Sequence, residues 1–263
     1  MIISGFSGIG VIIRGGMSQS PFRFLSADIN LSQNINIYLP SYGGENLRRI
    51  ISPNIGTISG RVSLIPTASS SAMFYNIVKD FEPVDVKLYY YSGRNRSFTT
   101  CFLDNLTFSC KAGEMVNLSF DVVCEGEDFE SNSKRYTVAE KLVTWDKTGI
   151  TGFPLSATED LNSFTYSVKN NLVLIRTAEG LLPRKYGKGI QEVSGNLTYF
   201  SSIDSLREPS RLNKYKIQVS NAVTFYVDDF SVTHKIANHW TYKTPLSPGI
   251  VITTLDWTRV DDI

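Results

Sequence analysis

The segment GTISGRVSL at residues 56–64 alternates apolar and polar residues, and a related segment, QEVSGNLTY, occupies residues 191–199. In both segments a Ser-Gly step, at residues 59–60 and 194–195, precedes a second alternating stretch. Strict alternation predicts a β-strand with one face on the core and the other toward solvent. The two segments therefore predict corresponding strands in the two halves of the chain.

Further segments repeat in the same order along the chain. INLSQNINI (29–37) resembles YSVKNNLVL (166–174), with Asn34 and Asn171 at the same step. The remaining matched segments are DVKLYYY (85–91) with KYKIQVS (214–220), CFLDNLTFS (101–109) with FYVDDFSVT (225–233), and MVNLSFDVV (115–123) with GIVITTLDW (249–257). The second of these matches aligns two polar steps, Asp104-Asn105 and Asp228-Asp229.

One helix is predicted in each half, after the Ser-Gly strand. Apolar residues in SSSAMFYNIVKD (69–80) fall at helical spacing, which predicts an amphipathic helix. The corresponding stretch, SSIDSLREPSRLNKY (201–215), predicts a weaker helix, because Pro209 must break or begin a helical turn.

We interpret the shared order of elements as a tandem duplication. The predicted fold class is all-β with minor α, consisting of two tandem β-sandwich or half-barrel domains with one helix each. Residues 1–127 form the first domain with an N-terminal arm, residues 128–160 a linker or hairpin, and residues 161–263 the second domain. Within the linker, YTVAEKLVTW (136–145) can add a strand. The alternative is that the halves share only the general alternation of β proteins.

Composition limits the partners of the chain. Hydrophobic residues make up 42 % of its 263 residues, enough for packed cores, and the net charge of +1 argues against a protein that wraps nucleic acid. A nearly neutral chain is also prone to self-association. The apolar start MIISGFSGIGVIIRGG (1–16) is interrupted by Arg14 and falls short of the roughly 20 residues of a spanning helix. We therefore expect an extended arm or first strand and no membrane partner.

The residues that carry chemistry form no recognisable catalytic or metal-binding pattern. His234 and His239 lack further ligands at metal-binding spacing, and the three cysteines, Cys101, Cys110 and Cys124, contain no C-x-x-C pair. A disulfide between Cys101 and Cys110 is possible across a hairpin, but buried thiols are the preferred interpretation. We predict a protein that is not an enzyme and needs no cofactor or metal.

The stretch LNSFTYSVKNNLVLIRTAEGLLPRKYGKGIQEVSGNLTYF (161–200), with its two strands around a loop, resembles the tail tube proteins of long-tailed phages. MVNLSFDVVCEGED (115–128) resembles the closing strand of such a domain. The resemblance implies two tube-like domains whose chains join edge to edge into a ring, with other tail proteins as partners and DNA passing transiently through the lumen. It also implies a trimer with pseudo-sixfold symmetry, a hexamer being the alternative, and a place in the virion tail after assembly in the host cytoplasm.

Two groups of residues are candidates for contacts in such an assembly. The acidic run after the closing strand is a candidate lining of the lumen, where it would repel phosphates: Glu125, Glu127, Asp128 and Glu130. The loops at 38–55 and 175–190 are candidates for contacts between rings. In the second of them the predicted contact residues are Gly180, Leu182, Pro183, Lys185 and Gly187.

Three alternative functions stay open at this point. A baseplate hub or tube-initiator ring fits the strong divergence of the two halves. A carbohydrate- or receptor-binding module could stack sugars on Trp145, Trp240 or Trp257. A hydrolase could use a close acidic pair. Such pairs occur at Asp80 and Glu82, at Asp228 and Asp229, and at Asp261 and Asp262.

Overall fold

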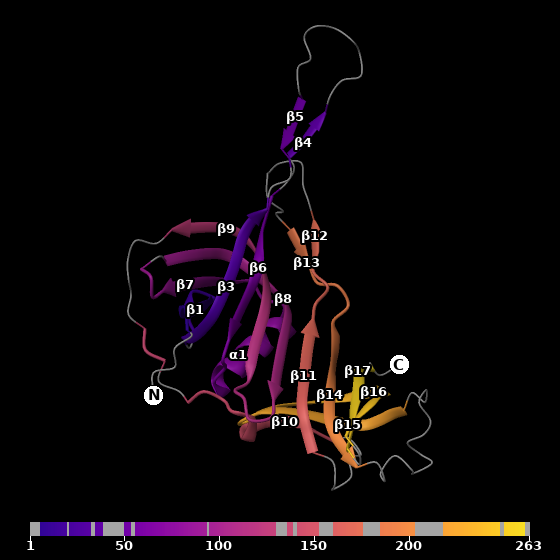
Figure 1. The fold of residues 1–263 in the computed structure, drawn as a ribbon. Coiled ribbons are helices and arrows are strands. Elements are labelled where there is room, and N and C mark those ends of the chain that lie inside the picture. Colours follow the sequence, from indigo (N-terminus) through magenta and orange to yellow (C-terminus); the bar gives the residue numbers. More distant parts are fainter. Residues whose placement is uncertain are drawn as a thin grey trace.

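Strands dominate the computed structural model of the protein, and most belong to one sheet that runs from the N-terminal half into the C-terminal half (Figure 1). The structure describes residues 6–19, 21–32, 35–38, 50–53, 56–93, 95–129, 136–138, 141–152, 160–175, 185–202, 218–247 and 250–260. No helix in these ranges is long and apolar enough to cross a membrane.

The elements of the N-terminal half are β1 (Gly8–Arg14), β2 (Met17–Ser18), β3 (Phe22–Ser32), β4 (Ile35–Tyr38), β5 (Ile50–Pro53), β6 (Thr57–Leu64), α1 (Ala68–Asp80), β7 (Val84–Tyr90), β8 (Asn95–Lys111) and β9 (Asn117–Phe129). Those of the C-terminal half are η1 (Trp145–Lys147), β10 (Thr148–Thr151), β11 (Asp160–Lys169), β12 (Val173–Ile175), β13 (Lys185–Gly187), β14 (Glu192–Ser202), β15 (Gln218–Val227), β16 (Phe230–Ser247) and β17 (Ile250–Arg259). The predicted all-β fold with minor α is confirmed.

The N-terminal half closes into a barrel around α1. Its strands follow the order β8-β7-β1-β3-β6-β9, and β9 pairs again with β8. The apolar N-terminal run forms β1, which pairs with β7 along its length and with β3 only at residues 22–24. Residues 8–14 therefore form the first strand and not an extended arm.

The C-terminal half continues the sheet without closing in the described ranges. β11 pairs with the last part of β8, and the order goes on as β14-β17-β16-β15-β10. The two halves therefore use the same order of strands, β3-β6-β9-β8-β7-β1 in the first and β11-β14-β17-β16-β15-β10 in the second. Registers agree as well, since Gly60 of β6 lies opposite Ile29 and Gly195 of β14 lies opposite Tyr166.

The helix α1 forms where helical spacing predicted it. Thr67 caps its N-terminus: the Thr67 side chain accepts from the backbone of Ser70, and Ser70 Oγ accepts from the Thr67 N–H at 2.8 Å. On the buried side Phe74 contacts Phe22 and Phe120, with ring centroids 5.1 and 4.7 Å away. These aromatic contacts fix the helix inside the barrel. The second predicted helix is not tested, because residues 201–202 end β14 and residues 203–217 lie outside the described ranges.

One of the sequence matches is wrong. Residues 101–109 lie inside β8, whereas residues 225–233 contain the end of β15, a turn and the start of β16. The Asp104-Asn105 step lies at a β-bulge of β8, and Asp228 lies in the turn with a left-handed backbone. Asp and Asn are favoured in both kinds of irregular backbone, so their presence did not distinguish a bulge from a turn.

The linker also differs from its prediction. The acidic run, predicted to follow the closing strand, instead belongs to β9, which extends as far as Phe129. The described parts of YTVAEKLVTW, residues 136–138 and 141–145, contribute only a bridge between Thr144 and Met115. The strand of this region is β10, which follows at Thr148–Thr151 and pairs with β15.

All three cysteines are free and buried. Cys101 lies opposite Cys124 in the β8–β9 ladder, so the hairpin partner considered from sequence, Cys110, is not its neighbour. Burial raises the pKa of the Cys110 thiol to about 11, because an apolar site disfavours the thiolate.

Tyr166 is the centre of the aromatic core in the C-terminal half. Its ring is fully buried and stacks on Phe225 with centroids 4.1 Å apart. The Tyr166 hydroxyl lies 2.8 Å from His234 Nε2, and Trp257 packs at 5.9 Å. His234, considered from sequence as a metal ligand, is thus a hydrogen-bonded part of the core, and the described ranges contain no cluster of metal-binding side chains.

We predict that Gly195→Ala lowers the free energy of unfolding by about 1–3 kcal/mol. A Cβ at this position would lie 2.2 Å from Thr165 O and 2.7 Å from the Trp257 ring. Urea unfolding of both variants measures the effect, with Gly187→Ala as the control because its nearest new contact is at 3.9 Å. Equal stability of the two variants would contradict this packing.

We predict that His234 destabilises the fold in mild acid. Burial, and to a smaller extent the charge of Arg259, lower the pKa of folded His234 to about 4, whereas in the unfolded chain the imidazole has its ordinary pKa of about 6.5. The free energy of unfolding is not reduced by His234 above its unfolded pKa. It falls as the pH drops from about 6.5 to about 4, because the unfolded chain then binds a proton that the folded chain does not. Urea midpoints across this range should fall less steeply in His234→Gln and as steeply as wild type in His239→Gln.

Candidate assembly surfaces

Eight strands form one continuous two-sided sheet, in the order β3-β6-β9-β8-β11-β14-β17-β16. In the described parts of β6, β9, β11, β14 and β17, alternate residues are mostly buried in the core, from Ile58 and Val62 in β6 to Leu255 and Trp257 in β17. The residues between them are half-buried or exposed, and nearly all are polar. We call this second side the polar face. Its hydroxyl and amide residues include Asn30, Ser59, Ser63, Asn105, Thr107, Ser109, Ser119, Ser163, Thr165, Ser167, Ser194, Asn196, Thr198, Thr254 and Thr258.

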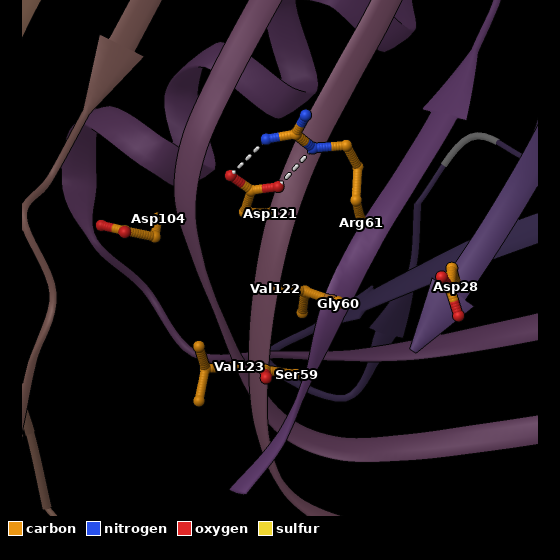
Figure 2. A pocket seen from close by; sticks show the side chains of 8 residues that line it. All are labelled: Asp28, Ser59, Gly60, Arg61, Asp104, Asp121, Val122 and Val123. Atoms are coloured by element: carbon orange, nitrogen blue, oxygen red, sulfur yellow. Dashed lines mark hydrogen bonds and ion pairs between the residues drawn. The ribbon is translucent and has the colours of Figure 1, made fainter. Parts of the chain in front are cut away.

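Arg61, in the first half of the polar face, is paired with an aspartate (Figure 2). Arg61 donates from Nε and Nη2 to the two carboxylate oxygens of Asp121, at 2.6 and 2.9 Å. Asp121 also accepts from Asn105 Nδ2 at 3.1 Å. Asp28 and Asp104 lie on either side of this pair and help to line a shallow depression. The arginine is therefore neutralised, which leaves hydroxyl and amide groups as the main chemistry of this area.

The two halves are joined by the pairing of β8 with β11. Residues 105–111 of β8 pair with residues 163–169 of β11, with Tyr166 opposite Phe108. On the polar face the hydroxyls of Thr107 and Ser167 lie 2.9 Å apart. Backbone hydrogen bonds extend the ladder at both ends, from Ala112 N to Asn162 O at 2.7 Å and from Asn170 N to Asp104 O at 2.9 Å. We call this contact the internal junction.

Two hairpins rise from the same end of the sheet, β4–β5 and β12–β13 (Figure 1). The β4–β5 hairpin lies between β3 and β6 in the chain, and the β12–β13 hairpin lies between β11 and β14. The β12–β13 hairpin and the segment after it carry exposed apolar residues: Val173, Ile175 and Ile190 are 52 %, 46 % and 79 % exposed. Exposed apolar residues of this kind are common on surfaces that contact a partner.

The base of the β12–β13 hairpin is fixed to the N-terminal half. Asn170 is fully buried and donates to Val78 O at 2.8 Å and Leu103 O at 3.3 Å. The Tyr186 ring stacks on Phe102, with centroids 4.8 Å apart. These contacts hold the hairpin in one position, so its apolar residues are presented on a fixed support.

Some of the predicted site residues lie in β9 or β13, and the others lie outside the described ranges. Glu125, Glu127 and Asp128 lie in β9, where Glu127 accepts from Arg96 Nε at 2.6 Å, and Asp128 is exposed. Lys185 and Gly187 lie in β13. The remaining predicted residues, Glu130, Gly180, Leu182 and Pro183, lie outside the described ranges.

Sequence reasoning missed the polar face as a surface. The alternation that predicted the strands also indicates which residues of each strand lie on the side away from the core. What could not be derived is that β8 and β11 pair in a register that puts both sets of polar residues on one side.

Several residues of the alternative functions have structural roles. Trp257 is buried, and Trp145 stacks on Phe164 with centroids 6.1 Å apart. Asp80 and Glu82 both form ion pairs with Arg14. The side chain of Trp240 and residues 261–263 are not described.

Comparison with known proteins gives a family match. A family model described as phage tail tube protein matches residues 63–247, which is 185 of the 263 residues and includes parts of both halves. A comparison with curated proteins gave no match.

Proposed function

The chain belongs to the phage tail tube protein family, and on this premise we propose that it forms a ring of the tail tube through which DNA passes. As a member of this family it is a structural component of the virion tail. The observation that carries the proposal is the continuous sheet of eight strands, with one face on the core and the other polar. In a ring, this polar face would line the passage.

The chemistry of the polar face supports passage without adhesion. DNA is held by unpaired lysine and arginine side chains that contact its phosphates. On the polar face Arg61 is neutralised by Asp121, and Lys111 and Lys169 stand at the ends of β8 and β11. A surface of hydroxyl and amide groups therefore offers phosphates few strong contacts. Glu125, in line with Asp121 along β9, would add repulsion at the rim.

We further propose that three chains form one ring with pseudo-sixfold symmetry. The equal strand order of the two halves, with Gly60 and Gly195 at the same place in the register, supports a tandem duplication. Each chain then supplies two units that are already joined at the internal junction. Three chains give six units, the number that the resemblance to tube proteins implies.

Two alternatives differ in their support. A hub or tube-initiator ring would use the same sheet, and it differs from a tube subunit in whether rings stack repeatedly. A glycan-binding module has less support, because Trp257 is buried and Trp145 packs on the core, so neither ring is a free platform for a sugar.

Native mass spectrometry and negative-stain microscopy of the purified protein at high concentration test the proposal. We expect closed rings of three chains with six similar lobes, and tubes built from them. Isolated rings that never stack would favour the hub. A chain that stays monomeric at every concentration would refute the proposal.

We predict that the double variant Val173→Ser with Ile175→Ser forms rings but not tubes. Both side chains are exposed on the β12–β13 hairpin, so the substitution should leave the melting temperature of the free chain unchanged while it removes apolar contacts between rings. Microscopy counts tubes against rings. The control, Val173→Leu with Ile175→Leu, keeps the apolar surface and should still form tubes. Tubes of normal length in the serine variant would exclude the hairpin from stacking.

A further inference from the structure

Two of the three cysteines face each other across one rung of the sheet. Cys101 of β8 lies opposite Cys124 of β9, and their sulfur atoms lie 2.6 Å apart. Both side chains are fully buried. Directly opposed residues of antiparallel strands have Cα atoms about 4.5–5.5 Å apart, within the range of about 4.4–6.8 Å that a disulfide spans. The two thiols can therefore bond without a large movement of either strand.

The third cysteine, Cys110, does not belong to this pair. It lies further along β8, opposite Phe164 of β11, and its thiol donates to the backbone oxygens of Lys111 and Glu114, each at 3.7 Å. A single buried thiol ordinarily serves as a small apolar side chain. Cys110 fits that role, whereas two thiols on one rung form a dithiol, which can be oxidised to an internal disulfide.

The shared strand order of the two halves does not require the dithiol. Cys124 lies two residues after the β9 partner of Gly60. Arg259 lies two residues after the β17 partner of Gly195, and it lies opposite Ile236. The corresponding rung of the C-terminal half therefore holds no cysteine, so the dithiol is a feature of the N-terminal barrel alone.

The rung with the dithiol lies where three strands of the barrel are adjacent. Cys101 also lies opposite Val84 of β7, so it has a neighbouring strand on each side. The residue before it, Thr100, has a left-handed backbone with φ of 47°, and its N–H donates to the Asp85 carboxylate at 2.9 Å. These contacts fix the backbone at Cys101. A covalent bond here would fasten β9 to β8, the pairing that closes the barrel.

Burial makes the dithiol slow to react. The thiolate is the reactive form of cysteine, and burial raises the pKa of the Cys101 thiol well above its ordinary value, because an apolar site disfavours the charge. The pair can therefore stay reduced while the chain is made in a reducing cytosol. A virion component is later exposed to oxidising surroundings, in which disulfides form and persist.

We propose that Cys101 and Cys124 are a modification site, at which hydrogen peroxide converts the dithiol of the folded chain into an internal disulfide that stabilises the β8–β9 pairing. One thiolate attacks the peroxide: a sulfur–oxygen bond forms, the oxygen–oxygen bond breaks, and the leaving hydroxide takes up a proton to give water. The second thiolate then attacks the sulfenic sulfur: the sulfur–sulfur bond forms, the sulfur–oxygen bond breaks, and a second water leaves. The two thiols lose two electrons and two protons in total, and the peroxide is reduced to two waters.

This site does not depend on the proposed ring, because both cysteines lie in one chain. A chain that forms no ring would still contain the dithiol, and a ring without the disulfide would leave the proposed function intact. Failure of one proposal is therefore distinguishable from failure of the other.

Peroxide treatment of the purified full-length chain tests the site. Of the three thiols, counted after unfolding in denaturant, we expect one to remain free. Peptide mapping without reduction should show the peptide of Cys101 linked to that of Cys124. The melting temperature should rise by roughly 5–10 °C, because the bond restricts the unfolded chain, and a thiol reductant should reverse the rise.

Cys110→Ala is the matched control and should keep both the linked peptide and the rise in melting temperature. Cys124→Ala should lose both. If that variant does not fold, the linked peptide of the wild-type chain decides. Three free thiols after peroxide treatment, or a linked peptide that contains Cys110, would overturn the site. A linked pair that leaves the melting temperature unchanged would overturn its stabilising role.

Discussion

The sheet depends on β8, because this one strand serves three neighbours. β9 pairs along one edge of β8, while the other edge is shared between β7, at residues 95–101, and β11, at residues 105–111. A bulge between Leu103 and Leu106 separates these two paired stretches of β8. The stretch paired with β7 closes the barrel around α1, and the stretch paired with β11 continues the sheet into the C-terminal half. A shorter β8 would leave two separate units with further open edges.

Closure is therefore unequal in the two halves. β1 pairs with both β7 and β3 and closes the N-terminal barrel, but β10, which has the place of β1 in the second half, pairs only with β15 in the described ranges. The backbone groups of the remaining edges need partners. The internal junction shows that edges of this sequence can pair in a defined register.

The two faces of the sheet have separate physical tasks. The core face holds aromatic clusters, around Phe74 in the barrel and around Tyr166 in the second half, and these fix the curvature of the strands. The polar face holds few bulky side chains, and its Arg61–Asp121 ion pair is neutral as a whole. The constraint that links the faces is the close approach at Gly60 and Gly195, where a Cβ would meet the neighbouring strand at 1.8 and 2.2 Å. Glycine at both places is required by the packing of adjacent backbones.

Much of this arrangement was determined by the sequence alone. Alternation in GTISGRVSL and QEVSGNLTY identified β6 and β14, and helical spacing identified α1, because both patterns reflect which side chains reach the core. The same patterns could not separate the bulge at Asp104 from the turn at Asp228, since both favour the same residues. Only the tertiary structure decided that β8 pairs with β11, that Ser167 and Thr107 share a face, and that Leu31 is 50 % exposed where Val168, at the same place in β11, is buried. Strand pairing joins residues far apart in the chain through backbone groups that every residue carries, so its register leaves no local mark on the amino-acid sequence.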